Sequence, residues 1–213
     1  MTIFEESLEI LRRCWAGELF SYHGKHYQIE GLEAFPRPVQ ARLLSCRAMH
    51  APNPDLLGPE DAAFVCGGVG MSMATCRPGA LPNLVRATGC RLAENFRVET
   101  VIVAATPGAA VLDDIRRTGA VAVVFSQPST HRTVQLKGND ARIVPLEASD
   151  LAVVEHYVAA FVAELESFGF PQPFTRALLA QPADDLVGVQ LTIAAAYSQT
   201  PGPQAGRPLV RPA

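Results

Sequence analysis

The sequence predicts an α+β fold that is mainly β, in which a compact barrel-like sheet is flanked by helices. Six short segments rich in valine and other apolar residues, separated by turn signals, predict the strands. Two amphipathic segments with clear boundary signals predict helices between those strands. A proline-containing break at 51–54 separates an N-terminal helix and hairpin from this barrel-like part.

The N-terminal segment, residues 1–50, begins with a predicted helix. Thr2 and Glu5 form a capping box, and the residues that follow place apolar side chains on one helical stripe: Phe4, Leu8, Leu11 and Trp15. Ser21 to Glu30 alternates weakly around a central Gly24, which predicts a small hairpin. We therefore expect two parts, an appendage over 1–50 and a barrel domain over 51–213.

The barrel domain shows a regular succession of strand-like segments. The predicted strands are Ala63–Thr75, Asn83–Leu92, Val98–Ala105, Ala120–Phe125, Thr130–Pro145 and Leu186–Ile193. The glycines at 67–70 lack the spacing of a dinucleotide-binding loop, and we interpret them as the entrance to the first strand.

Two helices are predicted within this domain. The first opens with Thr106 as cap and Pro107 at the first helical position, and it ends at Gly119. The second runs from Asp150 to Phe168 and carries an apolar stripe typical of a helix that lies on a sheet: Leu151, Val154, Val158, Phe161, Val162 and Leu165. The Pro/Gly-rich end, 200–213, is expected to lack regular structure and to wrap a neighbouring subunit.

Composition narrows the classes of function. The chain has 213 residues, 48% of them hydrophobic and 18% charged, with a formal net charge of -3. The sequence has no run of basic residues, so we expect no nucleic-acid partner. No apolar run is long enough to span a bilayer, and the acidic N-terminus does not resemble a signal peptide, so we expect no membrane partner and a cytoplasmic protein.

The cysteines do not predict a disulfide framework or a metal site. There are five, at positions 14, 46, 66, 76 and 90, and none forms a Cys-x-x-Cys pair. No cluster of Cys and His has the spacing of a zinc site. We expect reduced thiols and no metal. Ser126, Ser129 and His131 are close in sequence but do not constitute a catalytic triad.

The stretch from Phe125 to Gly138 is the most informative of the chain. Pro128 marks a turn, and the strand that follows places Thr133, Gln135 and Lys137 on one face. Arg132, Val134 and Leu136 share the other face. The polar face is either a solvated edge or a contact for an anionic ligand such as a phosphate or a flavin.

This stretch resembles, without a gap, a strand pair of the pyridoxamine 5'-phosphate oxidases that ends in an Arg-Gln-Val-Arg-Val-Glu-Gly motif. The matching residues are Phe125, Pro128, Arg132, Val134 and Gly138. The wider region from Leu56 to Leu209 is similar to the oxidase-like flavin-binding proteins. The resemblance implies an FMN-binding split β-barrel that works as a homodimer.

The chain departs from that family at two places that bear on the cofactor. Thr133 stands where the oxidases have a glutamine that contacts FMN, and Gln135 lies two residues later on the same face. Thr106-Pro107-Gly108 replaces a Ser-Arg-Lys turn that helps to hold the FMN phosphate, which removes two charge-assisted contacts. The bare helix start compensates in part, because its N–H groups attract an anion.

The resemblance implies a set of cofactor-binding residues: Arg86, Thr106, Arg132, Gln135 and Lys137. We expect Arg86, Thr106 and Lys137 near the phosphate, and Gln135 near the flavin or its ribityl chain. Arg91 lies in the same predicted strand as Arg86. No catalytic residue is assigned.

The N-terminal part resembles a short segment of the luciferase-like flavin or deazaflavin monooxygenases. The likeness covers residues 1–40 and includes Tyr22-His23-Gly24-Lys25-His26-Tyr27 and Pro36-Arg37-Pro38-Val39-Gln40. The rest of the (β/α)₈ barrel, which takes about 250 residues, is missing. We therefore do not expect monooxygenase activity.

The function predicted from the sequence is that of an FMN-dependent oxidoreductase acting on a small-molecule substrate or electron donor. Deazaflavin and haem are the alternative cofactors. In the second hypothesis the barrel carries or senses haem or a flavin without turnover, with His131 or His156 as an axial ligand. In the third hypothesis the site is vestigial and the chain is a structural dimer.

Overall fold

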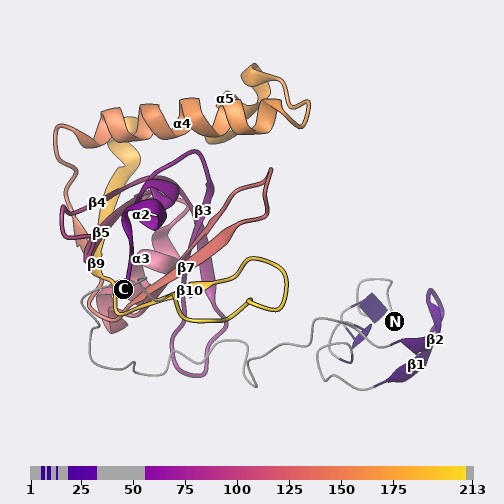
Figure 1. Cartoon of the computed structure of the whole chain (residues 1–213). Helices are drawn as coiled ribbons and strands as arrows, with labels where there is room; N and C mark the ends of the chain where they lie inside the picture. Colours follow the sequence, from indigo (N-terminus) through magenta and orange to yellow (C-terminus); the bar gives the residue numbers. More distant parts are fainter. Residues whose placement is uncertain (1–5, 8, 11–12, 14–18, 33–55, 210–213) are drawn as a thin grey trace. The chain divides into compact units, whose positions relative to one another are not determined.

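One antiparallel sheet of eight strands forms the framework of the larger part of the chain (Figure 1). The computed structural model describes residues 6–7, 9–10, 13, 19–32 and 56–209. The strands are β3 (Gly70–Thr75), β4 (Asn83–Leu92), β5 (Val98–Ala104), β6 (Val121–Ser126), β7 (Thr133–Gly138), β8 (Arg142–Val144), β9 (Leu186–Thr192) and β10 (Ala195–Ser198). Their order is β10-β7-β6-β3-β4-β5-β9-β8, and the barrel is not closed because β10 and β8 end the sheet. The predicted class, α+β and mainly β, is confirmed.

Helices cover parts of this sheet. They are α2 (Pro59–Val65), α3 (Ala109–Thr118), α4 (Asp150–Glu166) and α5 (Gln172–Leu179), and a 3-10 turn spans Ala183–Asp185. The predicted helix α3 buries Val111, Leu112 and Ile115 in the main core and ends at Gly119 in the left-handed conformation. The long helix α4 packs on β4 and α5, and Figure 1 shows it lying across one end of the sheet.

Alternation along the strands determines which side chains reach the core. In β3, β6 and β7, buried residues alternate with half-buried ones. Met73, Phe125 and Leu136 are completely buried on the inner face. Strand β5 is buried on both faces, because Ile102 and Ala104 belong to a second, smaller cluster against which Val153 and Val154 of α4 pack.

Two predicted strands differ from the structure. Residues 63–69 complete α2 and a turn, and β3 begins only at Gly70, because Pro59 with Glu60 and Asp61 in the first turn favours a helix. The predicted strand Thr130–Pro145 is divided by a bend at 139–140 into β7 and β8. The short elements α5 and β10 were not predicted.

The predicted cap of α3 needs correction, and the tail is described up to Leu209. The N-cap is Gly108, with no side-chain cap hydrogen bond. The last described residues do not leave the domain: the Leu209 N–H donates to the Ala196 carbonyl, and Tyr197 pairs with Pro208. The tail up to Leu209 therefore folds back along β10.

The predicted buried stripe of α4 is wrong at one residue. Leu151 is 45% exposed.

The chain divides into two compact units, Met1–Ser45 and Cys46–Ala213, whose residues contact mainly other residues of the same unit. In the first, β1 (Phe20–His23) and β2 (Gln28–Leu32) pair as the predicted hairpin. The carboxylate of Glu6 accepts backbone N–H groups of the hairpin turn, from Lys25 at 2.9 Å and His26 at 3.0 Å. The predicted capping box and apolar stripe, Thr2, Glu5, Phe4, Leu8, Leu11 and Trp15, lie outside the described residues.

Candidate functional site

The polar face predicted for β7 exists on the outer side of the sheet. Val134 and Leu136 are buried in the core, whereas Thr133, Gln135 and Lys137 point the other way and are half-buried. Strand β7 pairs with β6 on one side and β10 on the other, so these polar residues lie within the sheet and not at its edge. A solvated edge strand, one of the two interpretations of this pattern, is therefore excluded.

Strand β10 and the residue that follows it supply further contacts to this face. The Gln199 amide Nε2 donates to Gln135 Oε1 at 3.2 Å. The Lys137 ammonium lies 5.1 Å from the centre of the Tyr197 ring, as in a cation–π contact. Tyr197 was missed by the sequence analysis, because a four-residue strand leaves too short a pattern to recognise. Gln199 belongs to the terminal segment Gln199-Thr200-Pro201-Gly202-Pro203, which also resembles the oxidase-like proteins, but its contact with Gln135 was not predicted.

The register connects Gln135 with Arg86 across the sheet. Gln135 pairs with Val124, Val124 with Ser72, and Ser72 with Arg86. Paired residues of neighbouring strands point to the same face, so Gln135 and Arg86 share the outer face at a separation of three strands, roughly 14 Å. A ligand that touches both residues must be extended.

Arg86 lies beside two aromatic side chains of α4. Its guanidinium is 5.9 Å from the centre of the Phe161 ring. Burial raises the pKa of Tyr157 to about 12, and the nearby charge of Arg86 acts in the opposite direction. The side chain of Arg86 is exposed and held near these rings, so it can reach an anion on the outer face.

Thr106 stands in the turn after β5, and its polar groups are already bound. The Thr106 N–H donates to Asp185 Oδ1 at 3.1 Å, and the hydroxyl donates to the same oxygen at 2.7 Å. Ala87 of β4 pairs with Val103 of β5, so Arg86 and Thr106 lie near the same end of neighbouring strands. A carboxylate of the chain itself occupies the place predicted for a phosphate contact.

Arg132 is directed away from the other predicted residues. It makes ion pairs with Glu60 at 3.0 Å and Asp61 at 2.9 Å, both at the start of α2. Its guanidinium also lies 4.4 Å from the centre of the Phe64 ring. The structure thus brings Gln135 and Lys137 together, places Arg86 in the same row, and uses Arg132 to hold a helix.

Apart from Ser72, the outer face between Lys137 and Arg86 carries apolar residues. They are Ala74 on β3, Leu84 on β4, and Ala122 and Val124 on β6, which belong to the same cross-strand rows. Leu84 is 67% exposed, and the other three are half-buried. We call this group, with Arg86, Gln135 and Lys137, the outer face patch.

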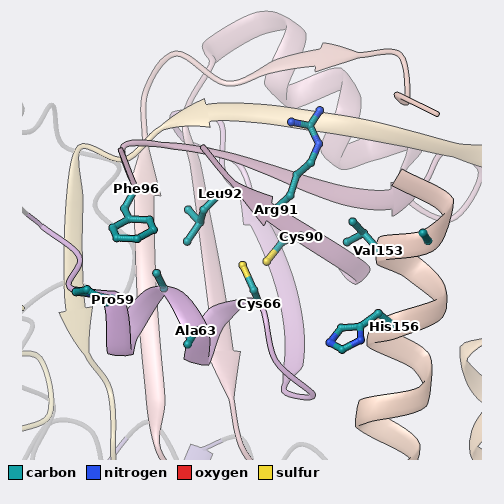
Figure 2. A pocket seen from close by; sticks show the side chains of 11 residues that line it. Pro59, Ala63, Cys66, Cys90, Arg91, Leu92, Phe96, Val153 and His156 are labelled. Atoms are coloured by element: carbon teal, nitrogen blue, oxygen red, sulfur yellow. The ribbon is translucent and has the colours of Figure 1, made fainter. Parts of the chain in front are cut away.

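A pocket of about 620 Å³ opens elsewhere, where α2, β4 and α4 meet (Figure 2). His156 lines it, whereas His131 lies in the exposed turn between β6 and β7 with a φ of 59°. The lining residues are Pro59, Ala62, Ala63, Cys66, Cys90, Arg91, Leu92, Phe96, Ala152, Val153 and His156. Among the described residues, no three His, Cys, Asp or Glu side chains are grouped so as to hold a metal. None of the described helices has both the length and the apolar composition that a membrane span requires.

Comparison with protein families gives one match, to the luciferase-like monooxygenase family over residues 1–58. This match confirms the resemblance of the N-terminal segment. No curated protein matches the chain.

Among solved structures the chain is similar to an F420 reductase, with 19% identity over 63% of this chain and 93% of that one and a TM-score of 0.43. It is also similar to a pyridoxamine 5'-phosphate oxidase-related, FMN-binding protein from Nostoc punctiforme, with 15% identity over 70% and 87% of the two chains and a TM-score of 0.39. A third is HupZ of Group A Streptococcus, with 15% identity over 70% and 100% and a TM-score of 0.44. The matched structures thus include the oxidase-like kind of protein that residues 56–209 resemble.

Proposed function

We propose that the chain binds FMN on the outer face patch, between two copies of itself, and acts as an FMN-dependent oxidoreductase. The observation that carries this proposal is the row that places the Gln135 amide and the Arg86 guanidinium on one open face. Lys137, two residues from Gln135 on the same strand face, adds a second cation. The motif that resembles the oxidases contains the same strand.

The residues present fit FMN in part. The amide of Gln135 suits the polar edge of a flavin ring or its ribityl chain, and either Arg86 at the far end of the row or Lys137 beside Gln135 suits a phosphate. Thr106 adds its N–H and hydroxyl only if Asp185 releases them. Arg132 would act by positioning the hairpin and α2.

The bound flavin would supply the redox chemistry, and the chain would orient it. Gln135 is itself fixed by Gln199, so its amide is presented in one direction. The ring of Tyr197 holds the Lys137 ammonium beside the same strand. These two residues therefore reach the ligand with little loss of side-chain freedom.

The apolar part of the outer face patch supports the dimer in this proposal. Leu84 and its half-buried neighbours lie among the polar residues, and removing such apolar side chains from water favours association. A second copy would cover this surface and exclude water from the flavin.

The experiment is a titration of the purified chain with FMN, in which the quenching of flavin fluorescence and the elution volume on a sizing column are followed together. We expect micromolar binding by a dimer. Lys137→Gln and Arg86→Gln should each weaken binding at least about tenfold, since a charge-assisted contact contributes about 1.5–3 kcal/mol and about 1.4 kcal/mol is a factor of ten. Arg142→Gln, the same charge change on the edge strand β8, is the matched control and should leave the affinity unchanged.

The same titration separates the alternatives. If the chain binds a deazaflavin but not FMN, the cofactor is a deazaflavin. If haem gives a Soret band that is lost in His156→Ala, the cofactor is haem and the flavin proposal is wrong. If FMN binds, reoxidation of the reduced complex by a quinone is compared with that of free reduced FMN. A bound flavin that reacts no faster than free flavin would indicate a carrier, and no binding at all would indicate a vestigial site.

A further inference from the structure

Two cysteines from distant parts of the sequence meet in the wall of the pocket between α2, β4 and α4. Cys66 is the C-cap residue of α2, and Cys90 lies in β4. The Cys90 thiol donates to the Val65 carbonyl at 3.1 Å, and that carbonyl belongs to the peptide group that precedes Cys66. Figure 2 shows the two sulfur atoms pointing toward one another.

The two thiols differ in exposure and in acidity. Cys90 is buried, whereas Cys66 is half-buried and lines the pocket. When Cys66 is a thiolate, the single proton of the Cys90 thiol can turn from the Val65 carbonyl to the Cys66 sulfur. That hydrogen bond lowers the pKa of Cys66 to about 7, with help from the Leu92 N–H and against the effect of burial. The same hydrogen bond and burial raise the pKa of Cys90. One sulfur is thus prepared as a nucleophile, and the other keeps its proton.

A buried carboxyl group lies behind this pair. Glu99 of β5 is completely buried, and neither of its carboxyl oxygens has a hydrogen-bond partner among the described residues. Burial, followed by the negative charge of Cys66, raises the pKa of Glu99 to about 8, and contact with the Cys90 thiol opposes this. Burying a carboxyl group without a hydrogen-bond partner costs free energy, so its retention beside two thiols calls for an explanation.

We propose that Cys66 and Cys90 are a redox-active thiol pair that reduces an apolar hydroperoxide and closes to a disulfide. The Cys66 thiolate attacks the terminal peroxide oxygen and breaks the O–O bond. The alcohol leaves after taking one proton from water, and Cys66 becomes a sulfenic acid. The Cys90 sulfur then attacks the Cys66 sulfur, the S–S bond forms, and the hydroxyl group leaves as water. Two thiols are oxidised and one peroxide is reduced, with two electrons transferred.

Glu99 relays the proton in the second step. Its carboxyl can accept the proton of the Cys90 thiol on one oxygen and deliver a proton from the other toward the departing hydroxyl group. This role explains why a carboxyl group is retained in the core without a fixed partner. The step needs no cofactor, so it is independent of the proposed flavin site.

The pocket determines the class of peroxide. Most of its lining is apolar and includes Phe96, Leu92 and Val153, while Arg91 and His156 provide polar groups (Figure 2). A hydroperoxide with a hydrocarbon body buries that body against these side chains, whereas hydrogen peroxide gains nothing from them. We therefore expect cumene hydroperoxide to react at least tenfold faster than hydrogen peroxide.

The test uses the full chain, reduced and then treated with one equivalent of cumene hydroperoxide. Trypsin does not cleave between Arg77 and Pro78, so Cys66 and Cys76 fall in one peptide, 48–86, and Cys90 falls in 87–91. Mass spectrometry should find these peptides joined by a disulfide in the wild-type chain and in Cys76→Ser. The joined peptide should be absent in Cys66→Ser and Cys90→Ser.

A second measurement on the wild-type chain needs no variant. The rate at which iodoacetamide labels Cys66 should reach half of its maximum near pH 7, because the thiolate is the reactive form. The proposal is overturned if the peptides remain separate, if Cys66 proceeds to sulfinic acid without cross-linking, or if labelling still rises steeply above pH 8. Equal rates with the two peroxides would overturn the assigned substrate class.

Discussion

The carboxylate of Asp185 accepts two hydrogen bonds from Thr106, one from its backbone N–H at 3.1 Å and one from its hydroxyl at 2.7 Å. The two residues are 79 positions apart in the sequence. The turn before α3 therefore carries its own anion, at the place where the resemblance to the oxidases implies a phosphate contact. A phosphate that enters this turn has to displace a carboxylate or sit beside it.

Asp185→Ala should increase the affinity for FMN about tenfold, because it frees two donors and removes a repelling charge; tenfold corresponds to about 1.4 kcal/mol. The check is the FMN titration, with riboflavin, which lacks the phosphate, measured in parallel. Asp184→Ala changes the same charge on a neighbouring exposed residue and should have little effect. An equal gain for riboflavin would contradict the explanation.

Arg132→Met should destabilise the fold by about 1–2 kcal/mol. The variant loses ion pairs to Glu60 and Asp61, each contributing about 0.2–1 kcal/mol at a partly exposed site, and a cation–π contact with Phe64 of about 0.5–1 kcal/mol. Urea unfolding measures this loss. Arg117→Met breaks one exposed pair with Asp113 on α3 and should cost less. If Arg132→Met weakens FMN binding as strongly as Lys137→Gln does, Arg132 contacts the FMN directly.

In Glu99→Gln the free energy of unfolding should change less with pH than it does in the wild-type chain. The folded-state pKa of Glu99, about 8, lies above its ordinary value of 4.5, so the unfolded chain releases the proton first. Stability contributed by the neutral carboxyl is therefore present below pH 4.5 and is lost as the pH rises toward 8, by at most about 1.4 kcal/mol per pH unit.

The range from pH 5 to 7 is the one to measure for Glu99→Gln, because Cys66 acts in the opposite direction above it. The folded-state pKa of Cys66 is lowered to about 7 from 9, so its contribution to stability increases as the pH rises over that interval. Unfolding by urea at several pH values gives the slope. If the wild-type chain and Glu99→Gln have the same slope, Glu99 is ionised in the folded state.

Gly68→Ala should destabilise the domain by about 1–3 kcal/mol, the usual effect of overpacking. A Cβ atom at this position would lie 2.6 Å from the carbonyl carbon of Ala160 in α4, so the helix would have to move. Gly58→Ala, with φ of -84° and no atom within 4 Å of the added Cβ, is the control and should lose only the smaller amount that Ala costs at the N-cap of α2. Thermal unfolding of the two variants compares them directly, and equal midpoints would show that α4 can shift without cost.

Local patterns in the sequence predicted the elements that reach this site. The alternation of Val134 and Leu136 with Gln135 and Lys137 fixed which side chains leave the core, because successive residues of a strand point to opposite faces. The apolar period of three to four residues likewise predicted α3 and α4. The first predicted strand was wrong at 63–69, since an apolar run of that length suits a short helix as well as a strand.

The sequence by itself determined the class of fold, the buried and outward faces of β7, and the turn at Pro128. Only the tertiary structure decided which distant groups became partners: Arg132 with the start of α2, Thr106 with Asp185, and Cys66 with Cys90. The physical reason is that periodicity reports the burial of a residue along its own element. Strand order and helix docking select its partner, and they depend on contacts far apart in the chain, such as β3 lying between β6 and β4.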